Sequence, residues 1–283
     1  MSTFDLTLKP AQTELLAQPG VSLTQAYEIT NNSSSSLLLT SSVLPWQPLG
    51  TDGSLTYDQV PTNPYFSFSL ANSDLQLGQT FLLRPHSTRQ LVLKIKSAID
   101  TPQTDGYFTF FISQNLTTSL NPDTNLSTAA RLGSHLLIST STTDHPASKA
   151  HISRFSISPI FKDVFFPKLN FQAEISNLSP YFFKTSGQII ISKNNLTLQE
   201  LSLFPQNILA NSSRTIFCNQ NNLPVNCSFT PPFWPGKYQA TLVLDPSLST
   251  PPSSLTFYVF PYSLILLILL PSLFLLVFKH FRH

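Results

Sequence analysis

The sequence has little charge, little glycine and almost no sulfur. Asp, Glu, Lys and Arg together make up 11% of the 283 residues, against roughly 25% in typical soluble domains. The net charge of +2 is too weak to indicate a nucleic-acid partner. Glycine occurs 8 times, cysteine twice and methionine once. The motifs of common enzymes are missing too: there is no Gly-x-Ser-x-Gly elbow, no His-Glu-x-x-His pair and no glycine-rich phosphate loop.

Residues that bind metals or transfer protons are also sparse. Glutamate occurs at four positions only, and no local pair of carboxylates indicates glycoside hydrolysis. Of the 6 histidines, only His280 and His283 lie close together, in a short tail where contact with lipid headgroups is the simpler explanation. We therefore expect a protein that is not an enzyme and that holds neither a metal nor a cofactor.

Phenylalanine and proline, by contrast, occur 23 times each. Aromatic residues favour strands, and frequent proline excludes long helices. Leu91, Leu93 and Ile95 alternate with Lys94 and Lys96, as in a half-buried strand. Short apolar runs of this kind, separated by turn residues, are typical of β-sandwiches. Strands are expected at residues 4–8, 23–30, 36–44, 65–70, 80–83, 90–96, 106–112 and 134–140, and then at 152–157, 169–177, 186–192, 200–203, 213–218, 236–244 and 254–260.

The apolar runs fall into two groups, with a polar linker over residues 141–149 between them. The two halves share a loose repeat, because the strand that ends at Asn31 and Ser33 has a counterpart that ends at Asn177 and Ser179. The fold class we predict is all-β: two tandem immunoglobulin-like β-sandwiches, residues 1–146 and 147–259, followed by a single C-terminal transmembrane α-helix.

The predicted helix covers residues 260–278. No charged residue occurs between Asp245 and Lys279, and the apolar run would span about 28 Å as a helix, close to the thickness of a bilayer. Lys279 and Arg282 then flank the membrane in a basic tail, residues 279–283, which the positive-inside rule places in the cytoplasm. This predicts a single-pass protein of the cell membrane, with the lipid bilayer as a partner and most of the chain outside.

The N-terminus conflicts with that location, because it lacks the apolar stretch of a signal peptide. Either the true start lies upstream of Met1, which we favour, or the domains are cytoplasmic and tail-anchored. The cysteines support the first explanation. Cys218 and Cys227 lie at the two ends of a turn-rich segment between two strands, where a disulfide would be favourable. Two free thiols are the alternative.

Aromatic side chains are the best candidates for a binding surface. Trp46, Tyr57 and Tyr65 lie in or beside the longest connection of the first domain, residues 48–64, which contains the turn signal Asp52-Gly53. Aromatic rings stack on sugars and on partner proteins. Packing of Trp46 and Tyr65 in the core at strand ends is the alternative.

Several short motifs follow one another through the chain. Those of the first half are Pro19-Gly20, Asn31-x-Ser33, residues 83–87, Gly106-Tyr107 and residues 131–137. Those of the second half read N-x-S-P, S-G-x-I-I-I, N-I-L-A-N-S-S-R and P-G-K-Y-x-A-T-L. In this order they resemble the WxL-interacting, peptidoglycan-binding surface proteins of bacteria, over nearly the whole chain. The resemblance implies a wall-associated binding or scaffold role without catalysis. The missing signal peptide and the cysteine pair depart from it.

The leading hypothesis is thus a non-enzymatic, membrane-anchored binding or scaffold protein of the cell surface, which engages peptidoglycan or other surface proteins. Residues 1–146 would be the distal binding domain, and residues 147–259 a membrane-proximal spacer. The alternative is a cytoplasmic tail-anchored adaptor that presents immunoglobulin-like domains to short peptides, as major-sperm-protein domains do. A third possibility is a pilus-chaperone-like role, which would need a cationic anchor in the cleft and no membrane helix.

Overall fold

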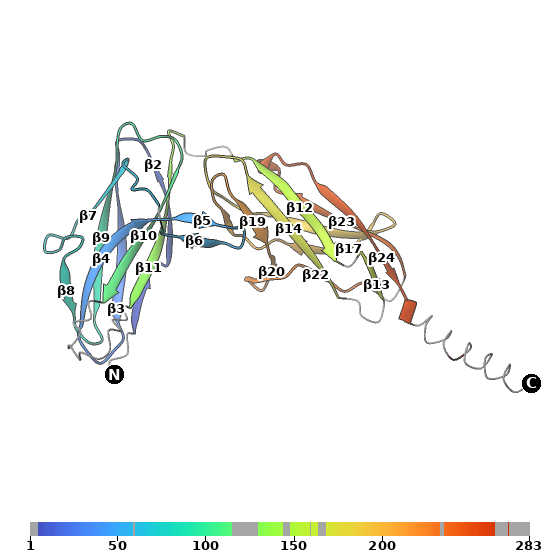
Figure 1. Ribbon diagram of the computed structural model, residues 1–283, viewed down its shortest axis with the longest axis horizontal. Helices are drawn as coiled ribbons and strands as arrows, with labels where there is room; N and C mark the ends of the chain where they lie inside the picture. Colours follow the sequence, from blue (N-terminus) through green and yellow to red (C-terminus); the bar gives the residue numbers. More distant parts are fainter. Residues whose placement is uncertain are drawn as a thin grey trace, which may run out of the picture. The chain divides into compact units, whose positions relative to one another are not determined.

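The structure is a computed structural model that describes residues 5–58, 60–114, 130–143, 148–158, 160–163, 168–232, 235–263 and 271. The chain divides into two compact units, built mainly from extended strands (Figure 1). Unit 1 comprises Met1–Leu49 and Ser54–Ala147, and unit 2 comprises Gly50–Gly53 and Ser148–His283. The division after Ala147 lies beside the expected end of the first domain.

Unit 1 is a sandwich of two sheets. One sheet has the strand order β1 (Leu6–Lys9), β3 (Ser22–Asn31), β9 (Thr88–Ser97), β7 (Phe66–Leu70). The other has the order β2 (Gln12–Ala17), β11 (Arg131–Thr140), β10 (Asp105–Gln114), β4 (Leu37–Pro45), β8 (Thr80–Leu83). A short hairpin of β5 (Gln47–Leu49) and β6 (Ser54–Thr56) follows β4.

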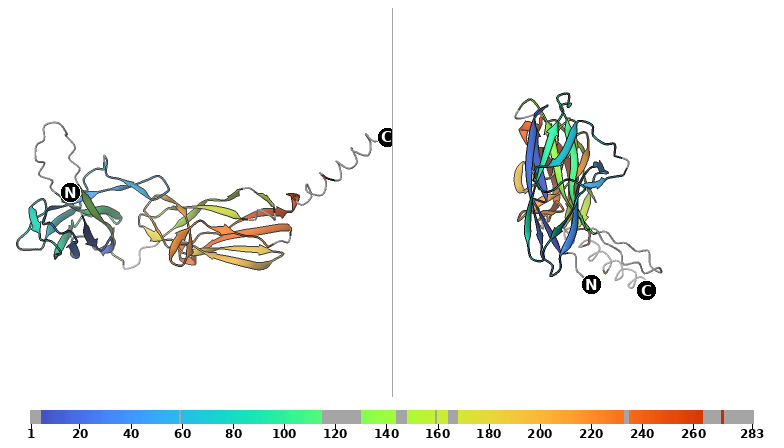
Figure 2. Two further views of the ribbon diagram at one scale, coloured as in Figure 1. Left: turned by 90° about the horizontal axis from the view of Figure 1, so that it is seen from below. Right: turned by 90° about the vertical axis from the view of Figure 1, so that its left-hand side faces the viewer.

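Unit 2 is built in the same way, and its strands lie in two layers (Figure 2). One sheet contains β12 (Ala150–Ser158), β14 (Leu169–Asn177), β19 (Ser213–Ile216) and β22 (Ser228–Phe229). The other has the order β13 (Phe161–Asp163), β24 (Ser253–Phe260), β23 (Gly236–Leu244), β16 (Gly187–Lys193), β17 (Leu196–Ser202). Shorter elements are β15 (Phe183–Lys184), β18 (Asn207–Ile208), β20 (Cys218–Gln220), β21 (Leu223–Val225) and a 3-10 turn (Pro246–Leu248).

Both units change sheets near their first strand. The opening strands pair antiparallel in one sheet, β1 with β3 and β12 with β14. The strands that follow them pair in parallel with the last strand of the other sheet, β2 with β11 and β13 with β24. Two packed sheets with this crossing form an immunoglobulin-like sandwich. The all-β, immunoglobulin-like part of the predicted fold class is therefore confirmed.

Period-two alternation creates the core of each unit. Leu91, Leu93 and Ile95 of β9 are at most 1% exposed, whereas the intervening Lys94 points outward to solvent. The same pattern on the facing strands gives each unit one hydrophobic cluster, made only from residues of that unit. Burying apolar area contributes about 25 cal/mol per Å², so these clusters hold each sandwich together.

The repeated Asn-x-Ser motif is a buried hydrogen-bond network in both units. Asn31 is 0% exposed, and its Nδ2 donates to the carbonyls of Ser35 (2.9 Å), Leu83 (3.2 Å) and Arg84 (3.0 Å). Its Oδ1 accepts from the backbone N–H and the hydroxyl of Ser33. The network ties the end of β3 to the end of β8.

The network recurs in unit 2. Asn177 is 1% exposed and donates to the carbonyls of Tyr181, Ile208 and Leu209 at 2.7–3.0 Å, and it accepts from Ser179. The end of β14 is thereby tied to the end of β18. The internal repeat seen in the sequence therefore corresponds to one packing device used twice.

The predicted transmembrane helix over residues 260–278 is wrong, and so is the single-pass membrane location derived from it. Among the described residues, no helix is long and apolar enough to cross a bilayer. The physical reason lies at the expected helix start, where Phe260 continues the extended strand β24 and pairs with Asp163 of β13. Residues 264–270 and 272–283, with the predicted flanking residues Lys279 and Arg282, lie outside the described residues.

Candidate binding surface on the outer sheet face of unit 1

Strand β10 supplies side chains to both faces of its sheet. Phe108, Phe110 and Ile112 point into the core. Because successive side chains of a strand alternate, Tyr107, Thr109 and Phe111 lie on the opposite, outer face. The register with β11 adds the residues opposite them, namely Leu137, His135 and Gly133. Aromatic and polar side chains therefore gather on the outer face of this sheet.

Trp46 lies between β4 and β5 and covers part of this face. Its indole Nε1 donates to the carbonyl of Phe108 at 2.8 Å. Its ring stacks on Tyr107 with a centroid distance of 5.0 Å and meets His135 edge-on at 5.6 Å. Trp46 is 5% exposed, so it supports Tyr107 and His135 and offers little surface to a ligand itself.

A chain of hydrogen bonds crosses the same face. The Tyr57 hydroxyl and the Thr109 hydroxyl share a bond of 2.9 Å, and the Thr109 hydroxyl meets Nδ1 of His135 at 3.0 Å. Burial lowers the pKa of His135 below its usual value. The ring is therefore neutral at pH 7, where it can accept or donate a hydrogen bond without carrying charge.

Arg131 completes the surface next to Tyr57. Its guanidinium lies 3.5 Å above the ring centroid of Phe111, and Nη2 donates to Ser42 Oγ at 3.3 Å. The ring of Tyr57 packs against Phe111 with a centroid distance of 5.3 Å. A cation over an aromatic face gains about 0.5–1 kcal/mol at an exposed site, so this position of the guanidinium is favoured although Arg131 is exposed.

Gly133 makes room for this arrangement. A Cβ atom at this position would lie 2.7 Å from Thr109 Cγ2 and 2.9 Å from Phe111 Cε1. The rings and hydroxyls can approach β11 only because no side chain stands there. We call the group formed by Trp46, Tyr57, Tyr107, Thr109, Phe111, Arg131 and His135 the outer-face cluster.

The structure brings together two of the three predicted binding residues. Trp46 and Tyr57 both belong to the outer-face cluster. Tyr65 lies elsewhere: it packs against the hydrophobic core, and its backbone N–H donates to Asn63 Oδ1 at 3.0 Å. The core-packing alternative thus describes Tyr65, whereas the Trp46 ring is buried on the outer face of the sheet, and a role of all three residues in binding stays a prediction.

Sequence reasoning missed Arg131 and His135 as members of the outer-face cluster. His135 could only be assigned to a strand, and Arg131 only to a family motif. The available signal was the alternation of β10, which places Thr109 and Phe111 on the face away from the core. The cross-strand register that adds Arg131 and His135 to that face follows from pairing between distant segments.

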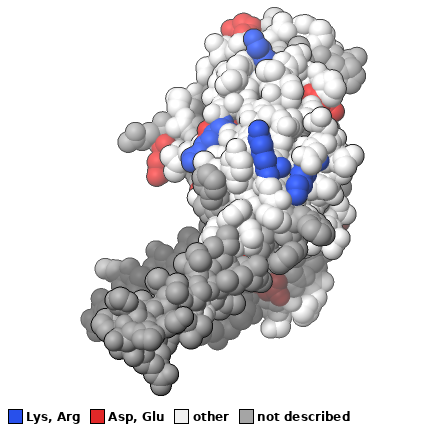
Figure 3. All heavy atoms as spheres, turned by 90° about the vertical axis from the view of Figure 1, so that its right-hand side faces the viewer, with Lys and Arg blue, Asp and Glu red and all other residues white. Residues whose placement is uncertain are grey.

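Charged side chains are sparse on the rest of the described surface. On the face drawn in Figure 3, most of the described surface is neither acidic nor basic. Within the described residues, no group of three or more His, Cys, Asp or Glu side chains is placed to hold a metal ion. The outer-face cluster therefore offers a ligand its shape, its aromatic rings and a few charged groups.

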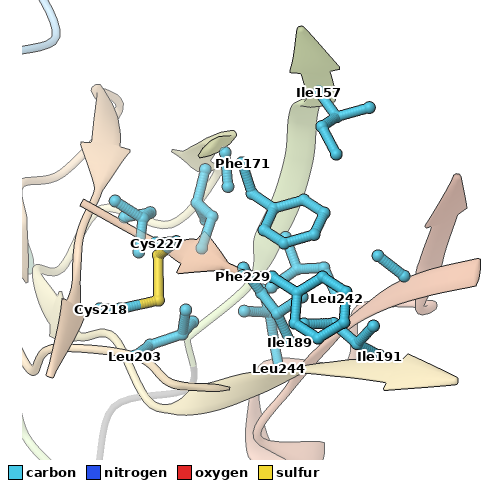
Figure 4. Close-up of a cluster of buried hydrophobic side chains, with 14 of the residues drawn as sticks. Ile157, Phe171, Ile189, Ile191, Leu203, Cys218, Cys227, Phe229, Leu242 and Leu244 are labelled. Atoms are coloured by element: carbon cyan, nitrogen blue, oxygen red, sulfur yellow. A yellow bond between two sulfur atoms is a disulfide. The ribbon is translucent and has the colours of Figure 1, made fainter. Parts of the chain in front are cut away.

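The predicted disulfide between Cys218 and Cys227 is confirmed. It joins the start of β20 to the chain that follows β21, and both cysteines are at most 4% exposed. Figure 4 shows the bond at one side of the buried cluster of unit 2, with Leu203 beside Cys218. The bond therefore fixes the β20–β21 hairpin against the edge of the core.

No protein-family model and no curated protein matches the sequence. Solved structures give distant likenesses. The E. coli chaperone DraB is 15% identical, with 90% of this chain and 97% of that chain covered and a TM-score of 0.40. The structure described as the Salmonella enterica SafA pilin in complex with the SafB chaperone is 12% identical, with 91% of this chain and 97% of that chain covered and a TM-score of 0.39. The class 5 fimbriae chaperone CfaA is 11% identical, with 91% of this chain and 100% of that chain covered and a TM-score of 0.42.

Proposed function

We propose that this chain is a non-enzymatic binding and scaffold protein and that the outer-face cluster of unit 1 is its binding surface. The observation that carries the proposal is the exposed Arg131 guanidinium, held 3.5 Å above Phe111 and next to Tyr57. Arg and Tyr are among the residues that contribute most to binding energy at protein interfaces. A guanidinium that is already positioned loses little freedom on binding, which favours affinity.

The partner we propose is a component of the cell surface, either a protein or a wall polymer such as peptidoglycan. The resemblance to WxL-interacting proteins supports this class of partner. The chemistry of the cluster supports a ligand that offers a carboxylate or phosphate to Arg131, because a guanidinium binds such groups with paired hydrogen bonds. The hydroxyl of Tyr57 and the neutral ring of His135 add polar contacts beside it.

Co-sedimentation of the full-length chain with purified peptidoglycan, and pull-down of surface-protein extract in parallel, test the proposal. We expect binding in one of the two assays. Arg131→Ala should weaken it about tenfold, which corresponds to about 1.4 kcal/mol. Gly133→Ala should also weaken it, because the added methyl group displaces Phe111 from below the guanidinium.

Arg89→Ala is the matched control. Arg89 also lies over an aromatic ring, 5.4 Å from the centroid of Phe81, but it belongs to the other sheet of unit 1 and pairs with Asp74. Its loss should leave binding unchanged. Equal weakening by both arginine variants, unchanged binding of Arg131→Ala, or turnover of the bound polymer would each contradict the proposal.

A further inference from the structure

Among the described residues, unit 2 leaves most of one edge of its five-stranded sheet without a partner strand. This edge is β17, whose residues are exposed along almost its whole length. Leu196 and Leu198 are 70% and 44% exposed. Proteins usually protect such an edge with lysine, proline or a covering segment. β17 contains neither lysine nor proline, and its single charged residue is Glu200.

The backbone of Glu200 points away from the sheet. The N–H of Leu203 donates to the carbonyl of Gly187 at 3.0 Å. Every second residue counted back from Leu203 therefore directs its N–H and C=O toward β16. The register pairs Leu201 with Ile189 and Glu200 with Ile190. Since backbone groups alternate in direction along an antiparallel strand, the N–H and C=O of Glu200 face the open edge.

A groove runs along this edge. It has a volume of about 430 Å³ and lies between residues 199–202 of β17 and the β20–β21 hairpin. One end of the groove is closed, because Leu203 forms an antiparallel β-bridge with Cys218 and the N–H of Phe204 donates to the carbonyl of Phe217 at 2.9 Å. The disulfide between Cys218 and Cys227 fixes the opposite wall. Strands β17 and β20 therefore diverge from this closed end and leave room between them for an added strand.

We propose that this groove binds an extended polypeptide segment by β-strand addition, with a lysine or arginine of that segment beside Glu200. Strand addition uses main-chain hydrogen bonds for affinity and side-chain contacts for specificity. Residues 199–202 offer about 13 Å of strand, at roughly 3.3 Å per residue. Among the described residues that line the groove, Glu200 is the only charged one, and the other polar ones are Gln199, Ser202, Asn219, Gln220, Asn226 and Ser228.

The charge argues for a basic segment and against a second copy of this chain. Among the described residues the Glu200 carboxylate forms no ion pair or hydrogen bond, so it is available to a cation. Two copies that paired antiparallel through β17 in a register centred on Glu200 would bring the two Glu200 side chains together, and like charges at facing strand positions are destabilising. The inference goes beyond the proposed function, because it concerns unit 2 and shares no residue with the outer-face cluster.

The test uses the full-length chain and a fluorescein-labelled hexapeptide of alternating threonine and valine with one central lysine, with anisotropy as the measurement. A second peptide carries glutamate in place of the lysine. We expect the lysine peptide to bind at least tenfold more tightly than the glutamate peptide, and Glu200→Lys to reverse this order. Glu200→Pro should abolish the binding of both peptides, because it removes an outward N–H and leaves the ladder to β16 intact.

Two controls address folding and site. Glu14→Lys changes the one charge of the edge strand β2 in unit 1 and should leave binding unchanged. A lysine peptide with N-methylated backbone amides should not bind, a result that does not depend on the folding of any variant. Equal binding of the lysine and glutamate peptides, undiminished binding of the N-methylated peptide, or a dimer of the free chain that Glu200→Lys disrupts would overturn the proposal.

Discussion

His135 lies on the outer face of a sheet and is half-buried there. The Thr109 hydroxyl is hydrogen-bonded to its Nδ1, and the Trp46 ring packs against its ring in an edge arrangement. Burial lowers the pKa of His135, so the folded protein prefers the neutral ring more strongly than the unfolded chain does. Protonation at acidic pH therefore favours the unfolded state at this residue.

We predict that this residue makes stability depend on pH in a definite direction. A histidine whose folded-state pKa is lowered contributes fully above the unfolded value of about 6.5. That contribution is lost as the pH falls from there through the folded-state pKa. Urea unfolding at pH 7.5 and pH 5.0 should show a smaller loss of stability for His135→Gln than for the unchanged protein. The other titrating groups are common to both proteins, so equal losses would contradict the prediction.

At the scale of elements, strands with one buried face are readable from sequence. The expected strands at residues 169–177 and 236–244 coincide with β14 and β23. The sequence does not reveal β2 and β13. β13 spans only three residues, and both strands pair in parallel with the last strand of their unit, far away along the chain. Pairing of that kind depends on the assembled sandwich and leaves no local pattern.

The candidate site shows the same limit. Trp46 and Tyr57 can be selected from sequence because aromatic residues stand out in a long polar connection. Arg131 and His135 join them only through the register of β10 and β11. The edge strand β17 was expected at residues 200–203 instead of 196–202, because the alternation of Leu196 and Leu198 breaks before Leu201, where the register with β16 shifts.

The β20–β21 hairpin gives a prediction at this scale. The bridge between Cys218 and Cys227 closes a short loop, with a sequence separation of 9. It should stabilise the protein by about 2–3 kcal/mol, chiefly by restricting the unfolded chain. Replacing both cysteines by serine, or adding reductant, should lower the urea midpoint to the same extent, and reductant should not affect the double variant. Labelling of either thiol without reductant would show that the bridge is not formed.

At the scale of the whole molecule, one sandwich plan occurs twice with separate cores. Each hydrophobic cluster draws its residues from a single unit. Each unit also has its own buried asparagine, which ties one strand to another through three carbonyls. Cooperative unfolding requires shared packing, so a defect in one core should first lower the stability of the unit that contains it.

Calorimetry of Asn31→Ala and Asn177→Ala tests this independence. Each change removes the partner of several buried carbonyls, at about 1–3 kcal/mol for each buried group left unpaired. With a total of about 3 kcal/mol, one transition should fall by roughly 10 °C in each variant, and it should be a different transition in the two. Asn32→Ala is the control, because Asn32 is exposed and, among the described residues, its side-chain amide donates only to Asp5 and Thr7, so both transitions should stay in place. A single transition that shifts equally in both buried-asparagine variants would show instead that the two sandwiches unfold as one.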